Sequence, residues 1–252
     1  MNDLSSLDSS TSCETYYRRL HSDCGKVLDA TFVSNTGDLQ SASHSFVSDL
    51  EHWCSALVGH PESEMLKAAV SEYQFALLSL VQGQYRQAFM SLRLTMELLL
   101  GAVHFSGSEL EFRVWSMGNQ DLVWSAIVDD NSGVFSRRFV GAFFEGLTDE
   151  ARHYRLIAET TYRECSEYVH GNAATHLLLP GTVTFSQGTF ESWHQKAKSV
   201  RLTTSFALCC RYIRFLDAQT RNALEPLLAD NLSHLAEVRA IYGGPVEPAN
   251  NG

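Results

Sequence analysis

Residues 161–172, with the sequence TYRECSEYVHGN, carry an arginine and a histidine with six residues between them, just before a glycine. Such a pair suits cleavage of a phosphodiester bond. A guanidinium group is permanently charged and forked, so Arg163 would bind a phosphate and stabilise the charge that develops on it during cleavage. An imidazole can take up and release a proton near neutral pH, which is the task of His170.

The element that must position this pair is a helix predicted over residues 148–170, about 22 residues long, with Thr148 as its N-cap and Gly171 as its C-cap. At about 100° per residue, Arg163 and His170 lie within about 20° of one face. A core-facing stripe follows the other side at spacings of three and four residues: Ala151, Tyr154, Ala158, Thr161, Cys165 and Tyr168. Tyr162 and Val169 form a second apolar strip beside the pair, which predicts contact with another subunit.

The same residues also fit a plainer interpretation. Arg163 precedes Glu167 by four positions, so the two could form a surface ion pair worth only a few tenths of a kcal/mol. His170 could simply cap the last carbonyl groups of its helix. Ser166 and Glu167 share the face of Arg163, and Asn172 follows the cap. Each of these three either touches a substrate or is a solvated or capping residue.

The remaining chain predicts an all-α fold, because apolar residues recur at helical spacing and only five prolines interrupt them. Two long amphipathic helices, divided only by Gly83-Gln84, should form an antiparallel hairpin. We expect three parts: an N-terminal helical extension over 1–60, with 1–12 disordered, a helical bundle over 61–175, and a C-terminal part over 176–252. The expected helices span 14–33, 43–58, 63–82, 85–105, 109–117, 120–128, 134–146, 148–170, 190–216 and 218–241, with a small β-hairpin near 176–190.

Composition limits the classes of function. A net charge of -10 argues against a long groove that coats a nucleic-acid backbone, yet it allows an enzyme to grip one or two phosphates. The six cysteines contain no CxxC pair, so we expect reduced thiols, with Cys209 and Cys210 in the core. No motif for a metal or cofactor is present. No apolar run suggests a membrane span and no export signal is visible, so we expect a cytoplasmic protein.

Two further groups have both a structural and a functional interpretation. Arg93 and Glu97 lie four residues apart in an otherwise apolar helix, which predicts a buried ion pair. Alternatively, Glu97 helps to hold Arg163. Four aromatic residues could stack on a base, but aromatic side chains at helical spacing are usually core residues: Trp115, Trp124, Phe135 and Phe139.

The segment YRECSEYVHGN, preceded by the hairpin that carries SLRLTMELLL, resembles the HEPN superfamily (higher eukaryotes and prokaryotes nucleotide-binding domains) over about residues 62–175. The family motif is an arginine, four to six residues, and a histidine near the end of a late helix. The resemblance implies a metal-independent endoribonuclease without a cofactor, in which Arg163 holds the scissile phosphate and His170 acts as general base or acid. It also implies a homodimer whose two motifs face each other. Glu164 departs from the Asn, Asp or His that commonly follows the arginine.

Three functions follow from these observations. The first is a ribonuclease of toxin or antiviral-defence type that acts on RNA and is restrained by a regulatory protein partner. The second is a non-catalytic HEPN-type scaffold or adaptor that binds a nucleotide or a protein, which the net acidity and Glu164 favour. The third is a helical scaffold unrelated to that family.

Overall fold

A computed structural model describes residues 12–33, 36–170 and 173–245. Every regular element in these ranges is a helix, which confirms the all-α prediction for the described part of the chain. The predicted hairpin is formed by α3 (Ser63–Val81) and α4 (Tyr85–Phe105). Gly83 sits in the turn at φ 73°, a left-handed conformation, and a Cβ atom there would lie 3.1 Å from Val27 Cγ2.

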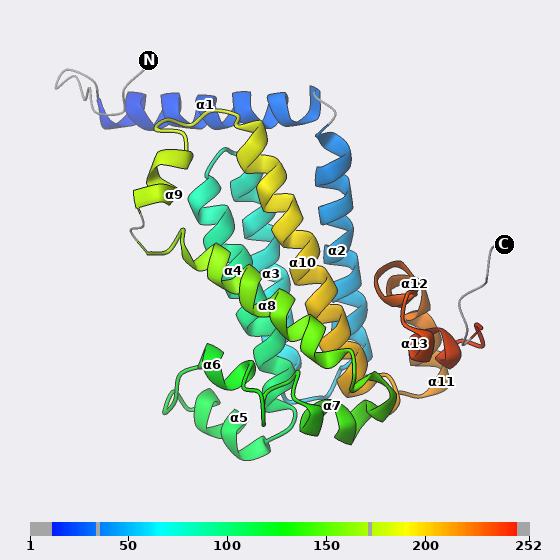
Figure 1. Cartoon of the computed structure of the whole chain (residues 1–252). Helices are drawn as coiled ribbons and strands as arrows, with labels where there is room; N and C mark the ends of the chain where they lie inside the picture. Colours follow the sequence, from blue (N-terminus) through cyan, green and yellow to red (C-terminus); the bar gives the residue numbers. More distant parts are fainter. Residues whose placement is uncertain (1–11, 34–35, 171–172, 246–252) are drawn as a thin grey trace.

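The core is built around α4 and α10 (Gln187–Tyr212), with α2 (Gly37–Ala56) and α8 (Ala151–Ser166) packed against α10 (Figure 1). Trp193 of α10 is fully buried, and its indole N–H donates to the Ala88 carbonyl of α4 at 3.0 Å. Helix α4 is long and apolar enough to cross a membrane by composition, but more than half of it is buried by its own chain. Its apolar surface therefore serves as the centre of the bundle.

The other helices close the two ends and one side of the bundle. Helix α1 (Cys13–Val33) lies across one end in Figure 1. The opposite end holds α5 (Glu109–Ser116), α6 (Trp124–Ile127), α7 (Arg137–Phe144) and the 3-10 turn η1 (Glu145–Leu147). At the side lie α11 (Ala218–Ala223), α12 (Glu225–Leu232) and α13 (Ala236–Ile241), while α9 (Ala173–Leu178) follows α8 along the chain.

Several predicted elements were wrong in extent or type. Helix α8 ends at Ser166, and residues 167–170 form turns, so no single helix runs over 148–170. The described residues at 176–190 hold no strand. The backbone N–H of Ser186 donates to the Tyr85 hydroxyl at 2.7 Å, so the loop is bonded to α4 instead of to a second strand. The helix expected over 218–241 is three helices, because Asp217 caps α11 and Pro226 begins α12.

The side chains with a core prediction behave as expected. Phe135 and Phe139 are buried, and Trp115 and Trp124 are partly buried against the core. All six cysteines are free thiols, and Cys209 and Cys210 are fully buried. The aromatic side chains and the two adjacent thiols therefore contribute packing.

Candidate functional site

The buried stripe of α8 fixes which of its side chains face solvent. Ala151, Ala158 and Cys165 are each at most 1% exposed, so the stripe predicted from spacing is confirmed. Beyond the helix, the ring of Tyr168 stacks on Phe89 of α4 with centroids 3.8 Å apart. Arg163 lies away from this stripe and is exposed, and so is His170 in the turn that follows.

The end of α8 tightens before it reaches His170. Val169 N–H bonds the Ser166 carbonyl at 3.0 Å, a three-residue step typical of a 3-10 turn, and His170 N–H bonds the same carbonyl at 3.1 Å. A guanidinium N–H of Arg86, on α4, donates to the Tyr168 carbonyl at 2.8 Å. Because the helix does not continue to residue 170, the calculated alignment of Arg163 and His170 on one helical face does not apply.

Neither the ion pair between Arg163 and Glu167 nor the capping role of His170 is present among the described residues. Glu164 forms an ion pair with Lys196 of α10 at 3.1 Å, and the Ser166 hydroxyl donates to the Tyr162 carbonyl at 2.7 Å. Within the described residues, Glu167 does not pair with Arg163, and His170 does not cap a carbonyl with its side chain. Arg163 and His170 therefore present their functional groups to solvent without a partner in the described chain.

The predicted pair of Arg93 and Glu97 is confirmed as a partly buried ion pair of 3.1 Å. Both side chains also contact Tyr162, whose hydroxyl donates to Glu97 Oε1 at 2.7 Å and accepts a hydrogen bond from Arg93. Trp124 stacks on the Tyr162 ring with centroids 3.8 Å apart. Burial raises the pKa of Tyr162, so its hydroxyl stays protonated.

This cluster changes two expectations. Among the described residues Glu97 is bonded to Arg93 and Tyr162, and it makes no hydrogen bond or ion pair with Arg163. Tyr162 makes its hydrogen bonds and its ring stack within its own chain, whereas Val169 is 36% exposed. The subunit contact predicted for Tyr162 and Val169 stays a prediction. Asn172 lies outside the described residues.

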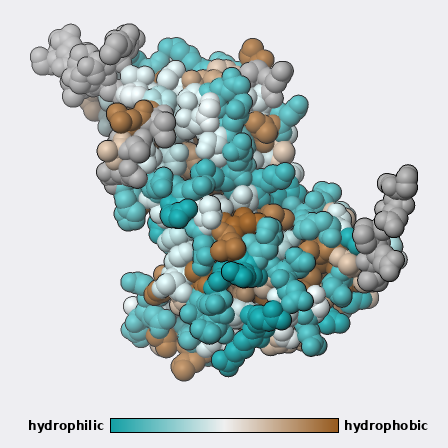
Figure 2. Space-filling model, viewed as in Figure 1, coloured by the Kyte–Doolittle hydropathy of each residue, from teal (hydrophilic) through white to brown (hydrophobic). Residues whose placement is uncertain are grey.

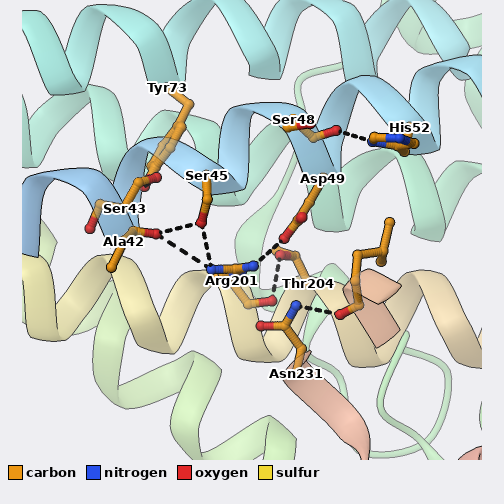
Figure 3. Close-up of polar contacts among 11 residues, drawn as sticks. Ala42, Ser43, Ser45, Ser48, Asp49, His52, Tyr73, Arg201, Thr204 and Asn231 are labelled. Atoms are coloured by element: carbon orange, nitrogen blue, oxygen red, sulfur yellow. Dashed lines mark hydrogen bonds and ion pairs between the residues drawn. The ribbon is translucent and has the colours of Figure 1, made fainter. Parts of the chain in front are cut away.

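A second polar site, between α2 and α10, was not predicted from the sequence (Figure 3). A guanidinium nitrogen of Arg201 lies 2.7 Å from Asp49 Oδ2, and another donates to the Ser45 hydroxyl at 3.1 Å. Burial raises the pKa of Asp49, although Arg201 opposes this shift. The contact is a close ion pair without an aligned hydrogen bond to Oδ2. This pair joins residues that are far apart in the sequence.

Next to this ion pair, Ser43 Oγ lies 2.6 Å from His194 Nδ1, and the Tyr73 hydroxyl donates to the Ser43 carbonyl at 2.9 Å. His194 is 4% exposed, its Nε2 has no partner in the described chain, and burial lowers its pKa to about 4. A cavity of about 550 Å³ opens here, with Glu191 and Asp230 on its wall. No spacing within α2 or α10 alone could reveal this site, because it needs both helices.

Metal ligands are not gathered anywhere in the described chain: no three His, Cys, Asp or Glu side chains there could hold one ion. The two polar sites therefore offer hydrogen bonds and ion pairs, and the end of α8 also carries an exposed cation, Arg163, and an exposed imidazole, His170.

No family model, curated protein or solved structure matches this chain. Its function is therefore inferred from the chemistry of the exposed and buried side chains described above.

Proposed function

We propose that the chain is a metal-independent endoribonuclease with a HEPN-type bundle, and that Arg163 and His170 perform the cleavage. The observation that carries this proposal is that both side chains are exposed at the end of α8 and have no partner in the described chain. Glu164, which adds a negative charge next to Arg163, is paired with Lys196 at 3.1 Å. Lys196 therefore compensates the charge of Glu164 beside Arg163, although the chain carries a net charge of -10.

In the proposed reaction, the ribose 2'-hydroxyl attacks the neighbouring phosphorus. One imidazole takes the proton of that hydroxyl, and the guanidinium of Arg163 stabilises the charge on the pentavalent phosphorus. A second imidazole, which is protonated at the start of the step, gives its proton to the departing 5'-oxygen. The products are a 2',3'-cyclic phosphate and a 5'-hydroxyl, and DNA is not cut because it lacks the nucleophile.

This reaction favours a homodimer, because one neutral imidazole cannot act as base and as acid in the same step. Two copies of His170, one from each subunit, would supply both roles. An apolar contact is available on the face that carries α8, where Figure 2 shows a hydrophobic patch on a largely hydrophilic surface. Leu156 on α8 is 49% exposed and Val169, in the following turn, is 36% exposed.

A free ribonuclease would damage its own cell, so the proposal includes a regulatory protein partner and a cytoplasmic toxin or antiviral-defence role. A non-catalytic HEPN-type scaffold or adaptor is the second candidate, and the observation that favours it is the net charge of -10. A scaffold would bind through the same face of α8 without cutting RNA.

The test uses purified wild type, Arg163→Ala and His170→Ala with a mixed RNA pool in EDTA, followed by mapping of the new ends. Arg152→Ala and His153→Ala are matched controls, because both side chains are exposed on the same helix. We expect the wild type to leave cyclic phosphate ends. Each site variant should lose roughly 100-fold or more in rate, as is usual when a proton-transfer group or a group that stabilises transition-state charge is removed. The controls should cleave at the wild-type rate.

Cleavage that persists in both site variants, or that leaves 3'-hydroxyl ends, would exclude this mechanism. If folded wild type binds RNA or a protein and cuts nothing, the scaffold is the better description. Expression in cells gives a parallel readout, since only a nuclease should lose toxicity in both site variants and keep it in both controls.

A further inference from the structure

A second feature lies near the motif: a cavity of about 670 Å³ between α1, the α3–α4 turn and residues 179–183, here called the α1–α4 cavity. Its size falls within the range of about 300–1,000 Å³ that is typical of small-molecule sites. The polar side chains on its wall include Tyr17, His21, Gln82, Gln84, Arg86 and Gln87. It is therefore large enough, and polar enough, to receive one nucleotide.

The charge of this wall is unusual for so acidic a chain. Among the described residues, no Asp or Glu lines the α1–α4 cavity, and Arg86 and His21 are the basic residues on it. By contrast, the cavity between α2 and α10 is lined by Glu191 and Asp230. A wall that carries the Arg86 guanidinium and no carboxylate among its described residues favours an anionic ligand over a cationic one.

The same wall carries groups that recognise a base. Tyr17 is 61% exposed, so its ring is available for stacking. Glutamine amides offer both donors and acceptors, which is what the edge of a nucleobase requires. Gln84 donates to Gln82 at 3.1 Å, which orients one of these amides. An anionic phosphate joined to an aromatic, hydrogen-bonding base matches this set of groups.

The α1–α4 cavity is also connected to the proposed catalytic segment. Arg86 lies on its wall and donates to the Tyr168 carbonyl, two residues before His170. The opposite wall is fixed, because Ser186 N–H is bonded to the Tyr85 hydroxyl at 2.7 Å. A ligand in the cavity would therefore touch the residue that holds the turn of His170.

We propose that the α1–α4 cavity binds one nucleotide, with the base against Tyr17 and the glutamine amides and the phosphate toward Arg86. The identification of that nucleotide as the RNA residue beside the cleaved bond rests on the proposed ribonuclease function. A free mononucleotide has the same chemistry, so the experiment tests both sources.

Gly181→Trp fills the cavity. Gly181 lines it, and a Cβ atom there would meet nothing within 4 Å. Gly188→Trp is the matched control, because a Cβ atom at Gly188 also meets nothing and this residue does not line the cavity. A second pair is Tyr17→Ala and Phe32→Ala, which remove exposed aromatic rings of α1 inside and outside the cavity.

The probe is a fluorescent 2'-O-methyl hexaribonucleotide of mixed sequence, which cannot be cleaved, with AMP, GMP, CMP and UMP as competitors. Binding is followed by fluorescence anisotropy. We expect Gly181→Trp and Tyr17→Ala to raise the Kd of the hexamer about tenfold, the lower part of the range for loss of one stacked base. Both controls should bind as the wild type does. If AMP, GMP, CMP or UMP displaces the hexamer, the free nucleotide is itself a ligand of the cavity.

Equal affinity in Gly181→Trp and Gly188→Trp, together with equal affinity in the Tyr17 and Phe32 variants, would overturn the cavity proposal. Cleavage is measured separately. If RNA cleavage needs Arg163 and His170 but is unchanged in Gly181→Trp, the nucleotide beside the cleaved bond does not occupy the cavity, and the nuclease proposal stands. If the cavity variants bind the hexamer more weakly and the wild type cuts no RNA, the nuclease proposal is excluded and the cavity remains a nucleotide site.

Discussion

His194 allows a quantitative prediction about stability. This side chain is 4% exposed, Ser43 Oγ lies 2.6 Å from its Nδ1, and its Nε2 is buried without a partner in the described chain. Burial lowers its pKa from 6.5 to about 4. The folded protein therefore keeps a neutral imidazole, hydrogen-bonded to Ser43 through Nδ1, while the unfolded chain takes up a proton as the pH falls below 6.5.

The size of the effect follows from proton linkage. Between the two pKa values the unfolded state binds one more proton than the folded state, so the free energy of unfolding falls as the pH is lowered. The contribution of His194 is complete above the unfolded pKa and is lost progressively down to the folded pKa. With pKa values of 6.5 and about 4, the loss between about pH 7.5 and about pH 5 is roughly 2 kcal/mol.

The perturbation is His194→Gln, which keeps a hydrogen-bonding group for Ser43 and removes the titration. Urea unfolding followed by circular dichroism gives the free energy of unfolding of both proteins at the two pH values. At about pH 7.5 the variant should be less stable than the wild type, and by about pH 5 roughly 2 kcal/mol of that difference should be gone. His104, whose pKa is also lowered by burial, is present in both proteins, so its contribution cancels. A difference in stability that stays constant with pH would refute this account of His194.

Two other substitutions test the fold and the charge at the motif. Gly133→Ala should lower the free energy of unfolding by about 2 kcal/mol, because its Cβ would lie 2.5 Å from the Asp129 nitrogen and the Ile127 oxygen. Gly188→Ala is the control, because its Cβ would meet nothing within 4 Å, and thermal unfolding should show no loss of stability. Lys196→Met removes the cation that pairs with Glu164, so the negative charge of Glu164 would act on the phosphate. The rate of RNA cleavage should fall about fivefold, roughly the effect of one such charge at the surface. Adding Glu164→Gln should restore the rate, and a double variant as slow as the single one would show that Lys196 acts in another way.

The helical hairpin could be predicted from the sequence because its signals are local. Apolar spacing marks α3 and α4, and Gly83 supplies the left-handed turn between them. The buried stripe of α8 follows from the same periodicity. Spacing also predicted the Arg93–Glu97 ion pair, since both residues lie on one helix.

The errors arose where distant segments decide the outcome. The end of α8 is bound by Arg86 of α4, and the segment predicted as a hairpin is bonded to Tyr85 through Ser186. Likewise, the pairing of Ser43 with His194 joins two helices that are far apart in the sequence. A single sequence contains no periodic signal for such contacts, so neither the turn before His170 nor the α2–α10 site could be predicted.

These distant contacts also bear on how the proposed site would work. The segment before His170 is held by Arg86 at the Tyr168 carbonyl and by the stack of Tyr168 on Phe89, and Lys196 fixes Glu164 beside Arg163. Trp124 and Arg93 hold the ring of Tyr162, one residue before Arg163. The backbone on both sides of the motif is thus anchored to the bundle, while the guanidinium and the imidazole have no partner in the described chain. Such anchoring lowers the cost of ordering the two groups when a phosphate binds, which is the condition for catalysis by a preorganised site.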